Sequence, residues 1–497
     1  APGGGVQLQI GPLTGTMDQI ASQLTSRYWD GDVHRWDVAP GGTITVNLQD
    51  LTIAERTLAR AALQTWTDIT GIRFREVVVG AQIEFHNAEE PGGPVAYTDS
   101  NWANGFLTSA DIHISSSWVS QYGSGLGTYS FQTYIHEIGH ALGLGHAGHY
   151  NDTAAYPIDV IFWNDSWATS VMSYFDQNEA WNQPGNFSIA HAVTPMQADI
   201  IAMQTLYGLS TTTRLNDTVY GYSSTADGIY NANVYPSVAY TIFDNGGTDT
   251  LNYSGWLGPQ TINLNAETFS NVLGLQGNVA IARGTIIENA IGGGAFDTII
   301  GNDANNRIVG GLGSDTLTGG AGDDTFQDSR AGLDTDTITD FGAGDRIVFT
   351  DATQATFTFS LTGNTLSYSG GSLTLTGVTG ALVASAVAGG GVQLALQASA
   401  TPHSRNDFDG DGRSDLIWRN DDGSFTNCLG QSNGGFVSNE ANAWTSLPTN
   451  WQVAGTGDFD GDGHADLLWR RDDGAFTSWA GQANGGFASN DASAWTV

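Results

Sequence analysis

A nine-residue repeat rich in glycine and aspartate places the strongest limit on how this chain can fold. Four consecutive units begin at Gly292, Gly301, Gly310 and Gly319, and the last two read G-G-L-G-S-D-T-L-T and G-G-A-G-D-D-T-F-Q. These two match the pattern G-G-x-G-x-D-x-U-x, in which U is apolar, at every fixed position. Six residues of each unit form a turn and the apolar residue closes a short inward strand, so the units are expected to stack as a parallel β-roll. The inward residues form a ladder too thin to be stable without bound metal: Ile299, Ile308, Leu317 and Phe326.

The turns of such a roll are expected to bind calcium. The aspartate and the turn carbonyls of one unit face those of the unit two further on, and Ca²⁺ prefers oxygen ligands of this kind. Asp297 is therefore expected to share an ion with Asp315, whereas Asp324 faces Asn306, so that site has one charge fewer and should be weaker. The expected calcium-binding residues are Asp297, Gly310, Gly311, Gly313, Asp315, Gly319, Gly320, Gly322 and Asp324. The alternative is a glycine-rich linker without ordered structure.

A second repeat occupies the last hundred residues. The sequence D-F-D-G-D-G begins at Asp407 and again at Asp458, and carboxylates stand at loop positions 1, 3, 5 and 9. The eight expected calcium ligands are Asp407, Asp409, Asp411 and Asp415, then Asp458, Asp460, Asp462 and Asp466. These loops lack the twelfth-position glutamate and the helical flanks of EF-hands, and solvated acidic turns without metal are the alternative. The pattern stops at Val497 before it is complete, so the natural chain is expected to be longer or to be processed here.

The segment H-E-I-G-H-A-L-G-L-G-H, residues 136–146, carries the chemistry of a catalytic zinc site. His136 and His140 are four residues apart on an expected helix, so both imidazoles project from one face. Gly143 permits positive φ and turns the chain so that His146 supplies a third nitrogen. Three neutral imidazoles with an open fourth position describe a catalytic site, and Glu137 is placed to act as the general base. The alternative is a helix with histidines in a polar crevice.

The first 235 residues mix helix and strand patterns. Thr52 and Glu55 form a capping-box signal for a helix that ends at Gly71, and a second helix is expected over about 131–142. A third should begin at residues 194–195 with Gln197 in the capping position and end at Gly208. Alternating apolar and polar residues predict strands at 44–48, 82–85 and 111–115.

The extended histidine motif resembles that of the metzincin metallopeptidases. The superfamily has a methionine turn beneath the zinc, and S-V-M-S-Y at residues 170–174 fits it, with Met172 as a hydrophobic floor. Serralysins and astacins have a tyrosine two residues after the methionine, and Tyr174 resembles it. The resemblance implies that Tyr174 is the fourth zinc ligand and assists catalysis. Without the resemblance, a tyrosine there would more often be plain core. His149 is the one rival ligand.

The resemblance to serralysins covers residues 1–400 and includes their RTX roll. It implies a secreted, extracellular bacterial zinc endopeptidase that cleaves polypeptides, carries one Zn²⁺ and several Ca²⁺, and is inhibited by a small protein in its cleft. It also implies that the strand at 111–115 borders the substrate cleft. Residues 401–497 depart from the family and resemble FG-GAP or VCBS repeats, which build β-propeller blades, although two repeats are too few for a closed propeller. These repeats suggest that the protein binds a surface ligand and is thereby attached to a cell surface.

We therefore expect a multidomain chain. Residues 1–235 are predicted as an α+β zincin-type metallopeptidase domain, 236–400 as an all-β parallel roll or sandwich, and 401–497 as two short calcium-binding repeats. The alternative function is a calcium-dependent surface or adhesion protein whose peptidase domain is vestigial or self-processing.

Composition excludes several classes of protein. The 497 residues contain 51 acidic and 16 basic side chains, a formal charge of −35, and every basic residue is arginine. Such a chain has no basic face for nucleic acid and no lysine chemistry. One cysteine, Cys428, excludes an intrachain disulfide, and no apolar run reaches the 18 residues of a transmembrane helix.

Overall fold

The structure is a computed structural model that describes residues 13–179, 187–397, 406–443, 445–460 and 462–489. The chain divides into two compact units, residues 1–396 and residues 397–497. The expected end of the roll at residue 400 and the final residues up to Val497 lie outside the described residues. Within the described part, no helix combines the length and the apolar character that a membrane span requires.

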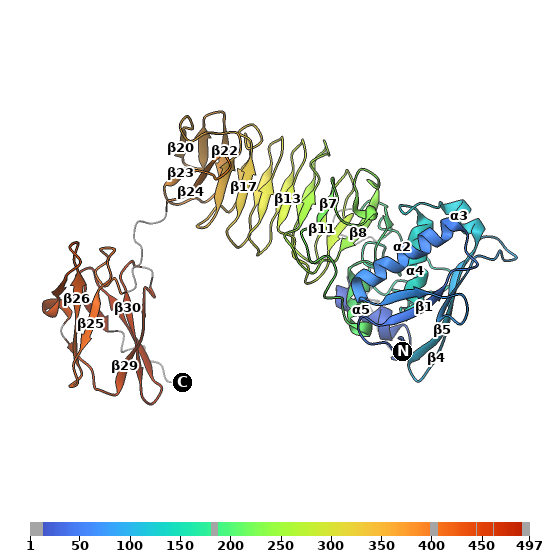
Figure 1. Ribbon diagram of the computed structural model, residues 1–497, viewed down its shortest axis with the longest axis horizontal. Helices are drawn as coiled ribbons and strands as arrows, with labels where there is room; N and C mark the ends of the chain where they lie inside the picture. Colours follow the sequence, from blue (N-terminus) through green and yellow to red (C-terminus); the bar gives the residue numbers. More distant parts are fainter. Residues whose placement is uncertain (1–12, 180–186, 398–405, 444, 461, 490–497) are drawn as a thin grey trace, which may run out of the picture. The chain divides into compact units, whose positions relative to one another are not determined.

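The first unit begins with a five-stranded sheet in the order β2-β1-β3-β5-β4. Strands β1, β5 and β4 of this sheet are labelled in Figure 1. All neighbours are parallel except β4, which runs antiparallel to β5. The strands are β1 (Thr43–Asn47), β2 (Arg73–Glu76), β3 (Ile83–His86), β4 (Ala96–Ala103) and β5 (Phe106–Ile114). The expectation that residues 111–115 border the cleft is wrong, because β5 is paired on both sides and β4 is the edge. The residues of β4 are half-buried or exposed, so the strand has no apolar alternation by which the sequence could reveal it.

Two long helices pack together beside this sheet. Helix α2 (Ile53–Thr70) has the predicted capping box of Thr52 and Glu55, and Gly71 ends it at φ +71°. Trp66 of α2 donates its indole N–H to the Ile135 carbonyl of α4 (Tyr129–Ala141) at 3.1 Å. Helix α5 (Gln197–Tyr207) begins later than predicted, because Met196 is its N-cap and Asp199, not Gln197, completes the cap. The other helical segments of this region are α1 (Met17–Ser22), the π-helical turn η1 (Gln23–Arg27) and α3 (Ser116–Tyr122).

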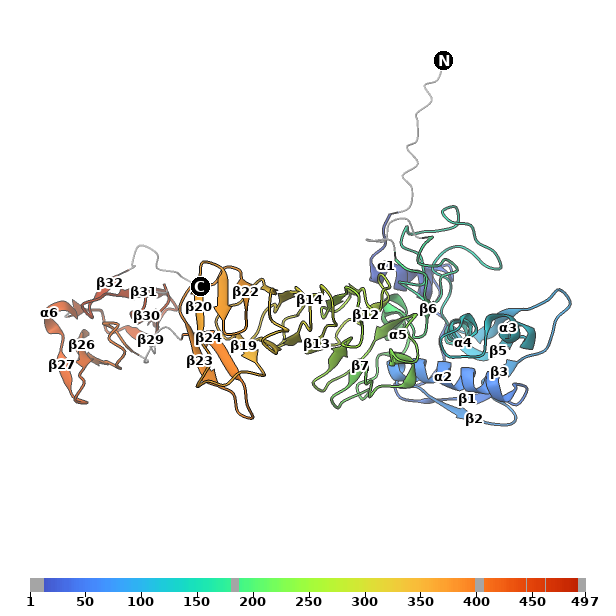
Figure 2. The same ribbon diagram turned by 90° about the horizontal axis from the view of Figure 1, so that it is seen from above.

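Residues after α5 form the predicted roll, and Figure 2 shows its strands following one another along the unit. Units two apart are neighbours in parallel register, with Ile299 beside Leu317 and Ile308 beside Phe326. All four of these side chains are fully buried, which confirms the inward ladder. The expected boundary between peptidase and roll at residue 235 stays a prediction; β7, at residues 219–221, already belongs to a sheet of the roll.

Two long sheets make up the roll, in the orders β10-β14-β16-β18-β22-β21-β20 and β23-β24-β19-β17-β15-β13-β9-β7, and a smaller sheet has the order β11-β12-β8-β6. The 3-10 turn η2 covers Gly228–Tyr230. The strands are β6 (His191–Ala192), β7 (Val219–Gly221), β8 (Val238–Ile242), β9 (Thr250–Asn252), β10 (Thr261–Asn263), β11 (Phe269–Ser270), β12 (Val279–Ile281), β13 (Asn289–Ile291), β14 (Thr298–Ile300), β15 (Arg307–Val309), β16 (Thr316–Thr318), β17 (Thr325–Asp328), β18 (Thr337–Ile338), β19 (Arg346–Phe349), β20 (Phe359–Thr362), β21 (Thr365–Tyr368), β22 (Gly371–Leu375), β23 (Leu382–Ala386) and β24 (Val392–Leu396).

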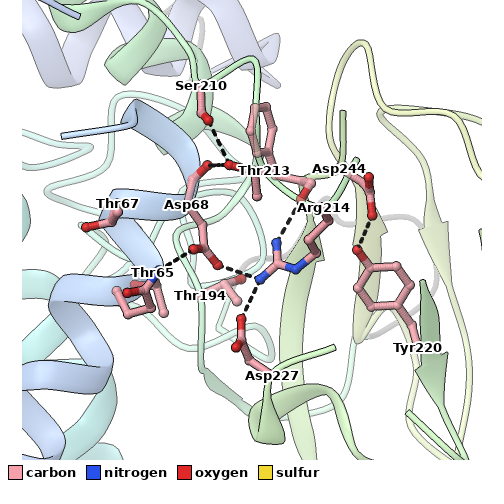
Figure 3. A network of polar contacts seen from close by, with 12 residues as sticks. Thr65, Thr67, Asp68, Thr194, Ser210, Thr213, Arg214, Tyr220, Asp227 and Asp244 are labelled. Carbon is pink, nitrogen blue, oxygen red and sulfur yellow. Dashed lines mark hydrogen bonds and ion pairs between the residues drawn. The ribbon is translucent and has the colours of Figure 1, made fainter. Parts of the chain in front are cut away.

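A buried polar network ties the roll to the helices (Figure 3). The guanidinium of Arg214, only 11% exposed, pairs with Asp68 of α2 and with Asp227 at 2.7 Å. Its other terminal nitrogen donates to the Phe243 carbonyl at 3.0 Å. Thr213 donates its hydroxyl to the Asp68 carbonyl at 2.5 Å. The buried pair of Arg214 and Asp68 therefore connects the start of the roll to α2.

The second unit consists of two antiparallel sheets. One has the order β25-β26-β27 with β28 paired to β26, and the other has the order β29-β30-β31-β32. The elements are β25 (Leu416–Arg419), β26 (Ser424–Gly430), β27 (Phe436–Ser438), α6 (Glu440–Ala443), β28 (Thr445–Ser446), β29 (Trp451–Gly457), β30 (Asp466–Arg471), β31 (Phe476–Gly481) and β32 (Phe487–Ser489). The predicted order of an α+β region, a parallel β-rich region and antiparallel C-terminal sheets is thus confirmed.

Candidate metal centre

The three histidines of the motif converge at one point. The Nε2 atom of His140 lies 3.0 Å from Nε2 of His136 and 3.0 Å from Nε2 of His146. Zn–N bonds of about 2.0–2.1 Å in a tetrahedral site would place ligand nitrogens about 3.3 Å apart. The three nitrogens are therefore spaced closely enough to share one zinc ion, and this donor set fits zinc.

Each imidazole is oriented by a partner on its far nitrogen. Nδ1 of His136 lies 2.9 Å from the Val171 carbonyl, and Nδ1 of His140 lies 2.8 Å from the Leu144 carbonyl. Donation from Nδ1 leaves the Nε2 lone pair for a metal. Burial lowers the pKa of His136 to about 4 and that of His140 to about 3, so both rings are neutral at pH 7.

The turn after α4 and the methionine below it depend on two glycines. Gly143 has φ +101°, and a Cβ there would overlap the carbonyl oxygen of His34. A Cβ on Gly139 would lie 2.5 Å from the sulfur of Met172, so the fully buried methionine fits directly against the helix between the two histidines. Both contacts bring the chain segments closer than a side chain would allow.

Glu137 lies beside the histidines and outside their ligand set. Thr98, on the edge strand β4, donates its hydroxyl to Glu137 Oε2 at 2.7 Å, and the same hydroxyl lies 3.1 Å from the Glu137 carbonyl. Burial raises the pKa of Glu137 to about 7, and the Thr98 hydrogen bond opposes that increase. The second carboxylate oxygen, Oε1, is the atom left to take a proton.

Two tyrosines border the cluster. The ring of Tyr174 is centred 4.5 Å from that of His146 and 5.9 Å from that of His136, and its role as a zinc ligand stays a prediction. Tyr28 was not predicted: its hydroxyl lies 3.3 Å from Nδ1 of His146, across 118 residues of sequence. No local motif could reveal that contact. His149, the rival ligand, is exposed and is not part of the histidine group.

Asp199 is a further residue that the motif analysis missed. Its buried carboxylate accepts hydrogen bonds from the Ser170 hydroxyl at 2.6 Å, the Val171 amide at 2.7 Å and the Met196 amide at 2.8 Å. Asp199 thus ties the methionine turn to the start of α5, and Val171 in turn orients His136.

Carboxylates of successive units lie close together in the roll. Asp315 Oδ1 accepts from the Asp297 amide at 2.8 Å, and Asp336 Oδ1 accepts from the Asp315 amide at 2.8 Å. The Oδ2 atoms of Asp315, Asp324 and Asp336 are buried without a hydrogen-bond partner, which is the arrangement a cation would complete. Burial raises the pKa of Asp315 to about 6 and that of Asp336 to about 8, with nearby carboxylates adding to both shifts.

The turn glycines stand where side chains would block these sites. A Cβ on Gly310 or Gly319 would overlap the carboxylate of Asp315 or Asp324. The other expected turn glycines have positive φ and are Gly311, Gly313, Gly320 and Gly322.

The weaker site predicted at Asn306 and Asp324 differs from the first. The side-chain oxygen of Asn306 accepts from the backbone amide of Asn302 at 2.7 Å, and its side-chain nitrogen donates to the Glu288 carbonyl at 3.1 Å. Both polar atoms of the Asn306 side chain are therefore used in hydrogen bonds within the turn.

The C-terminal loops each gather three of their four predicted aspartates. Among the described residues, the groups are Asp407, Asp409 and Asp415, and Asp458, Asp460 and Asp466, with carboxylate oxygens within 4.8 Å of one another. Asp411 and Asp462 lie outside these groups. Asp411 instead pairs with Arg413, and Asp462 accepts from the His464 amide at 2.9 Å.

The metzincin class of zinc peptidases is defined by three features, all present here: a helix with two histidines, a third histidine beyond a glycine turn, and a methionine below them. Residues 43–159 match the matrixin model of the M10 peptidases, residues 209–384 match the M10 serralysin C-terminal model, and residues 407–469 match the FG-GAP-like repeat. These matches identify residues 43–159 and 209–384 with the serralysin-type M10 peptidases and their C-terminal domain, and residues 407–469 with an FG-GAP-like repeat.

Curated relatives agree with this placement. The chain is 39% identical over 260 residues to serralysin of Photorhabdus sp. (strain Az29), which covers 49% of this chain and 52% of the relative. It is 35% identical over 314 residues to metalloprotease AprA of Pseudomonas entomophila (strain L48), covering 57% and 63%. Serralysin of Proteus mirabilis is 39% identical over 264 residues, covering 48% and 52%. The chain therefore spans between about half and two thirds of the length of these relatives.

Proposed function

We propose that this chain is a zinc-dependent endopeptidase that hydrolyses peptide bonds in extended polypeptides. The observation that carries the proposal is the convergence of three oriented Nε2 atoms beside a buried glutamate that is not one of the ligands. His136, His140 and His146 would hold the ion, with Tyr174 as a fourth, displaceable ligand. Zinc bound there lowers the pKa of a water molecule and polarises the scissile carbonyl.

The protein's own groups supply the proton transfers and the orientation. Oε1 of Glu137 accepts a proton during attack and returns it to the leaving amine, while Thr98 holds Oε2. The Tyr174 hydroxyl, once displaced, donates a hydrogen bond to the developing oxyanion. The free edge of β4 can pair with an extended substrate, which supports a polypeptide rather than a compact small molecule.

The roll and the C-terminal loops are proposed as calcium sites. The buried carboxylate oxygens without partners in the roll, and the two groups of three aspartates, support this assignment. Extracellular calcium modules bind at roughly 10⁻⁴–10⁻³ M, so sites of this affinity would be filled in a calcium-containing medium. We infer secretion into a calcium-containing medium, a small protein inhibitor of the cleft, and a surface ligand for the C-terminal repeats.

The rival function is a calcium-dependent surface or adhesion protein. Exposed apolar side chains on the second unit, among them Trp418 (64% exposed), favour a binding role for that unit. The intact positions of Glu137 and the three histidines favour peptidase activity for the first unit. A self-processing surface protein would combine the two.

The test is Glu137→Gln in the full chain. We expect the variant to keep one zinc per chain by metal analysis and to lose nearly all casein hydrolysis, because the amide cannot accept the proton. Glu440→Gln, an exposed position in the second unit, is the matched control and should keep full activity. Wild-type hydrolysis should stop with a zinc chelator. Casein turnover by the Glu137 variant would refute the general-base assignment, and an inactive wild type that holds zinc would favour the adhesion protein.

A further inference from the structure

A buried tyrosine–aspartate pair lies next to the metal centre, and the mechanism above does not use it. Tyr150 is 3% exposed and Asp165 is fully buried. The Tyr150 hydroxyl lies 3.1 Å from both carboxylate oxygens of Asp165. Because Asp165 accepts the hydroxyl proton, the lone pairs of the Tyr150 oxygen are directed elsewhere.

Those lone pairs face the main chain of Tyr174. The Tyr174 amide donates to the Tyr150 hydroxyl at 3.4 Å. The Tyr150 ring also packs beside two proposed zinc ligands, centred 4.8 Å from the ring of Tyr174 and 5.3 Å from that of His146. One buried side chain thus fixes the backbone of Tyr174 relative to a histidine of the cluster.

The other end of Tyr174 is held by the same loop. Burial raises the pKa of the Tyr174 phenol, and the nearby backbone of Asp152 opposes that rise. Asp152 has φ +69°, a conformation that a residue other than glycine rarely adopts and that is found mainly where the surroundings impose it. The loop from Tyr150 to Asp152 therefore contacts both the main chain and the hydroxyl of Tyr174.

We propose that Tyr150 and Asp165 are positioning residues for Tyr174: they hold its main chain still, so that side-chain rotation alone carries the phenol between the metal and the Asp152 amide. This inference rests on the proposed function and extends it. The Asp152 amide then serves as the resting place of the phenol while substrate occupies the fourth position. Without the pair, the backbone at residue 174 would move and the phenol would reach the metal in a poorer geometry.

Copper(II) is the probe, because a phenolate bound to copper gives a visible charge-transfer band that needs no turnover. Zinc is removed from the full chain and replaced by one equivalent of Cu²⁺. The wild type should show the band, and Tyr174→Phe should lack it. Tyr150→Phe should bind one copper and show a weaker or shifted band, and its zinc form should lose about tenfold in kcat with KM little changed. Asp165→Asn should act in the same direction.

The matched control is Tyr220→Phe, because Tyr220 forms the same kind of buried pair with Asp244, at 2.6 Å, within the roll (Figure 3). It should keep the band and the kcat of the wild type. If Tyr150→Phe and Asp165→Asn both keep the wild-type band and kcat, the inference is overturned. If the wild type itself shows no band, Tyr174 does not reach the metal, and both the fourth ligand in the proposed function and this inference are wrong. A variant that does not fold is recognised by its near-ultraviolet circular dichroism, and the other variant then decides.

Discussion

At the scale of single residues, Asp199 shows how one buried carboxylate supports a metal centre that it does not touch. Burial raises its pKa to about 6, against three hydrogen bonds that lower it, whereas an unfolded aspartate titrates near 3.9. Between these values the folded protein keeps a proton that the unfolded chain releases. The stability that this group contributes is therefore fully present below about pH 4 and is lost as the pH rises through 6.

Asp199→Asn removes this titration. We expect the difference in unfolding free energy between wild type and variant to shrink by about 2–3 kcal/mol from pH 4 to pH 7. Urea unfolding at the two pH values, with calcium and zinc in excess, measures it, and groups shared by the two proteins cancel in the difference. A difference that does not change with pH would contradict the assignment.

The residues of the centre also show what sequence can reveal. His136, Glu137, His140, Gly143 and His146 lie within eleven residues, so helix geometry and the glycine turn together predict their convergence. Contacts from distant segments have no such pattern: Thr98 meets Glu137 across 39 residues and Asp199 meets Val171 across 28. Met172 and Tyr174 could be predicted only through resemblance, because an apolar or aromatic side chain at those positions is ordinary core.

At the scale of elements, the nine-residue period predicted the stacking of the roll strands, because each turn and each inward side chain repeats at a fixed spacing. The edge strand β4 was missed, since its exposed polar residues carry no period. The period also predicted a weaker site at Asn306 and Asp324, which stays a prediction: Asn306 donates an N–H to the Glu288 carbonyl, so this position closes its turn by hydrogen bonds instead of offering a charge.

Asn306→Asp tests that interpretation of the roll. The substitution replaces the donor by an acceptor facing the Glu288 carbonyl and the Asp324 carboxylate. We expect the variant to bind one more calcium ion per chain, to melt at a higher temperature in millimolar calcium, and to melt below the wild type after chelation, because the added charge is then uncompensated. Asn364→Asp, an exposed position, adds the same charge and should change neither value. The ion count is measured by calcium analysis after dialysis, and the melting temperature by circular dichroism. An unchanged ion count would show that the turn binds calcium without a carboxylate at 306.

At the scale of the whole molecule, the peptidase region and the roll form one compact unit, and two arginines connect them. Arg214 is buried with Asp68, whereas Arg283 is 41% exposed and pairs with Asp18 and Glu267 at 2.7 Å each. Removing one partner of a buried pair leaves the other charge desolvated and costs about 3–5 kcal/mol, while an exposed pair contributes about 0–1 kcal/mol.

We therefore expect Arg214→Ala to lower the unfolding free energy of the first unit by about 3–5 kcal/mol and Arg283→Ala to lower it by less than about 1 kcal/mol. Since Asp68 belongs to α2 and Arg214 precedes the first strand of the roll, loss of the pair should weaken both regions together. Guanidinium unfolding in the presence of calcium, followed in parallel by casein hydrolysis and by far-ultraviolet circular dichroism, checks this. We expect the activity and the circular dichroism to be lost in one coincident transition, shifted to lower denaturant in Arg214→Ala only. If the circular dichroism of the roll keeps its wild-type midpoint while activity is lost earlier, the two regions are not coupled through Arg214.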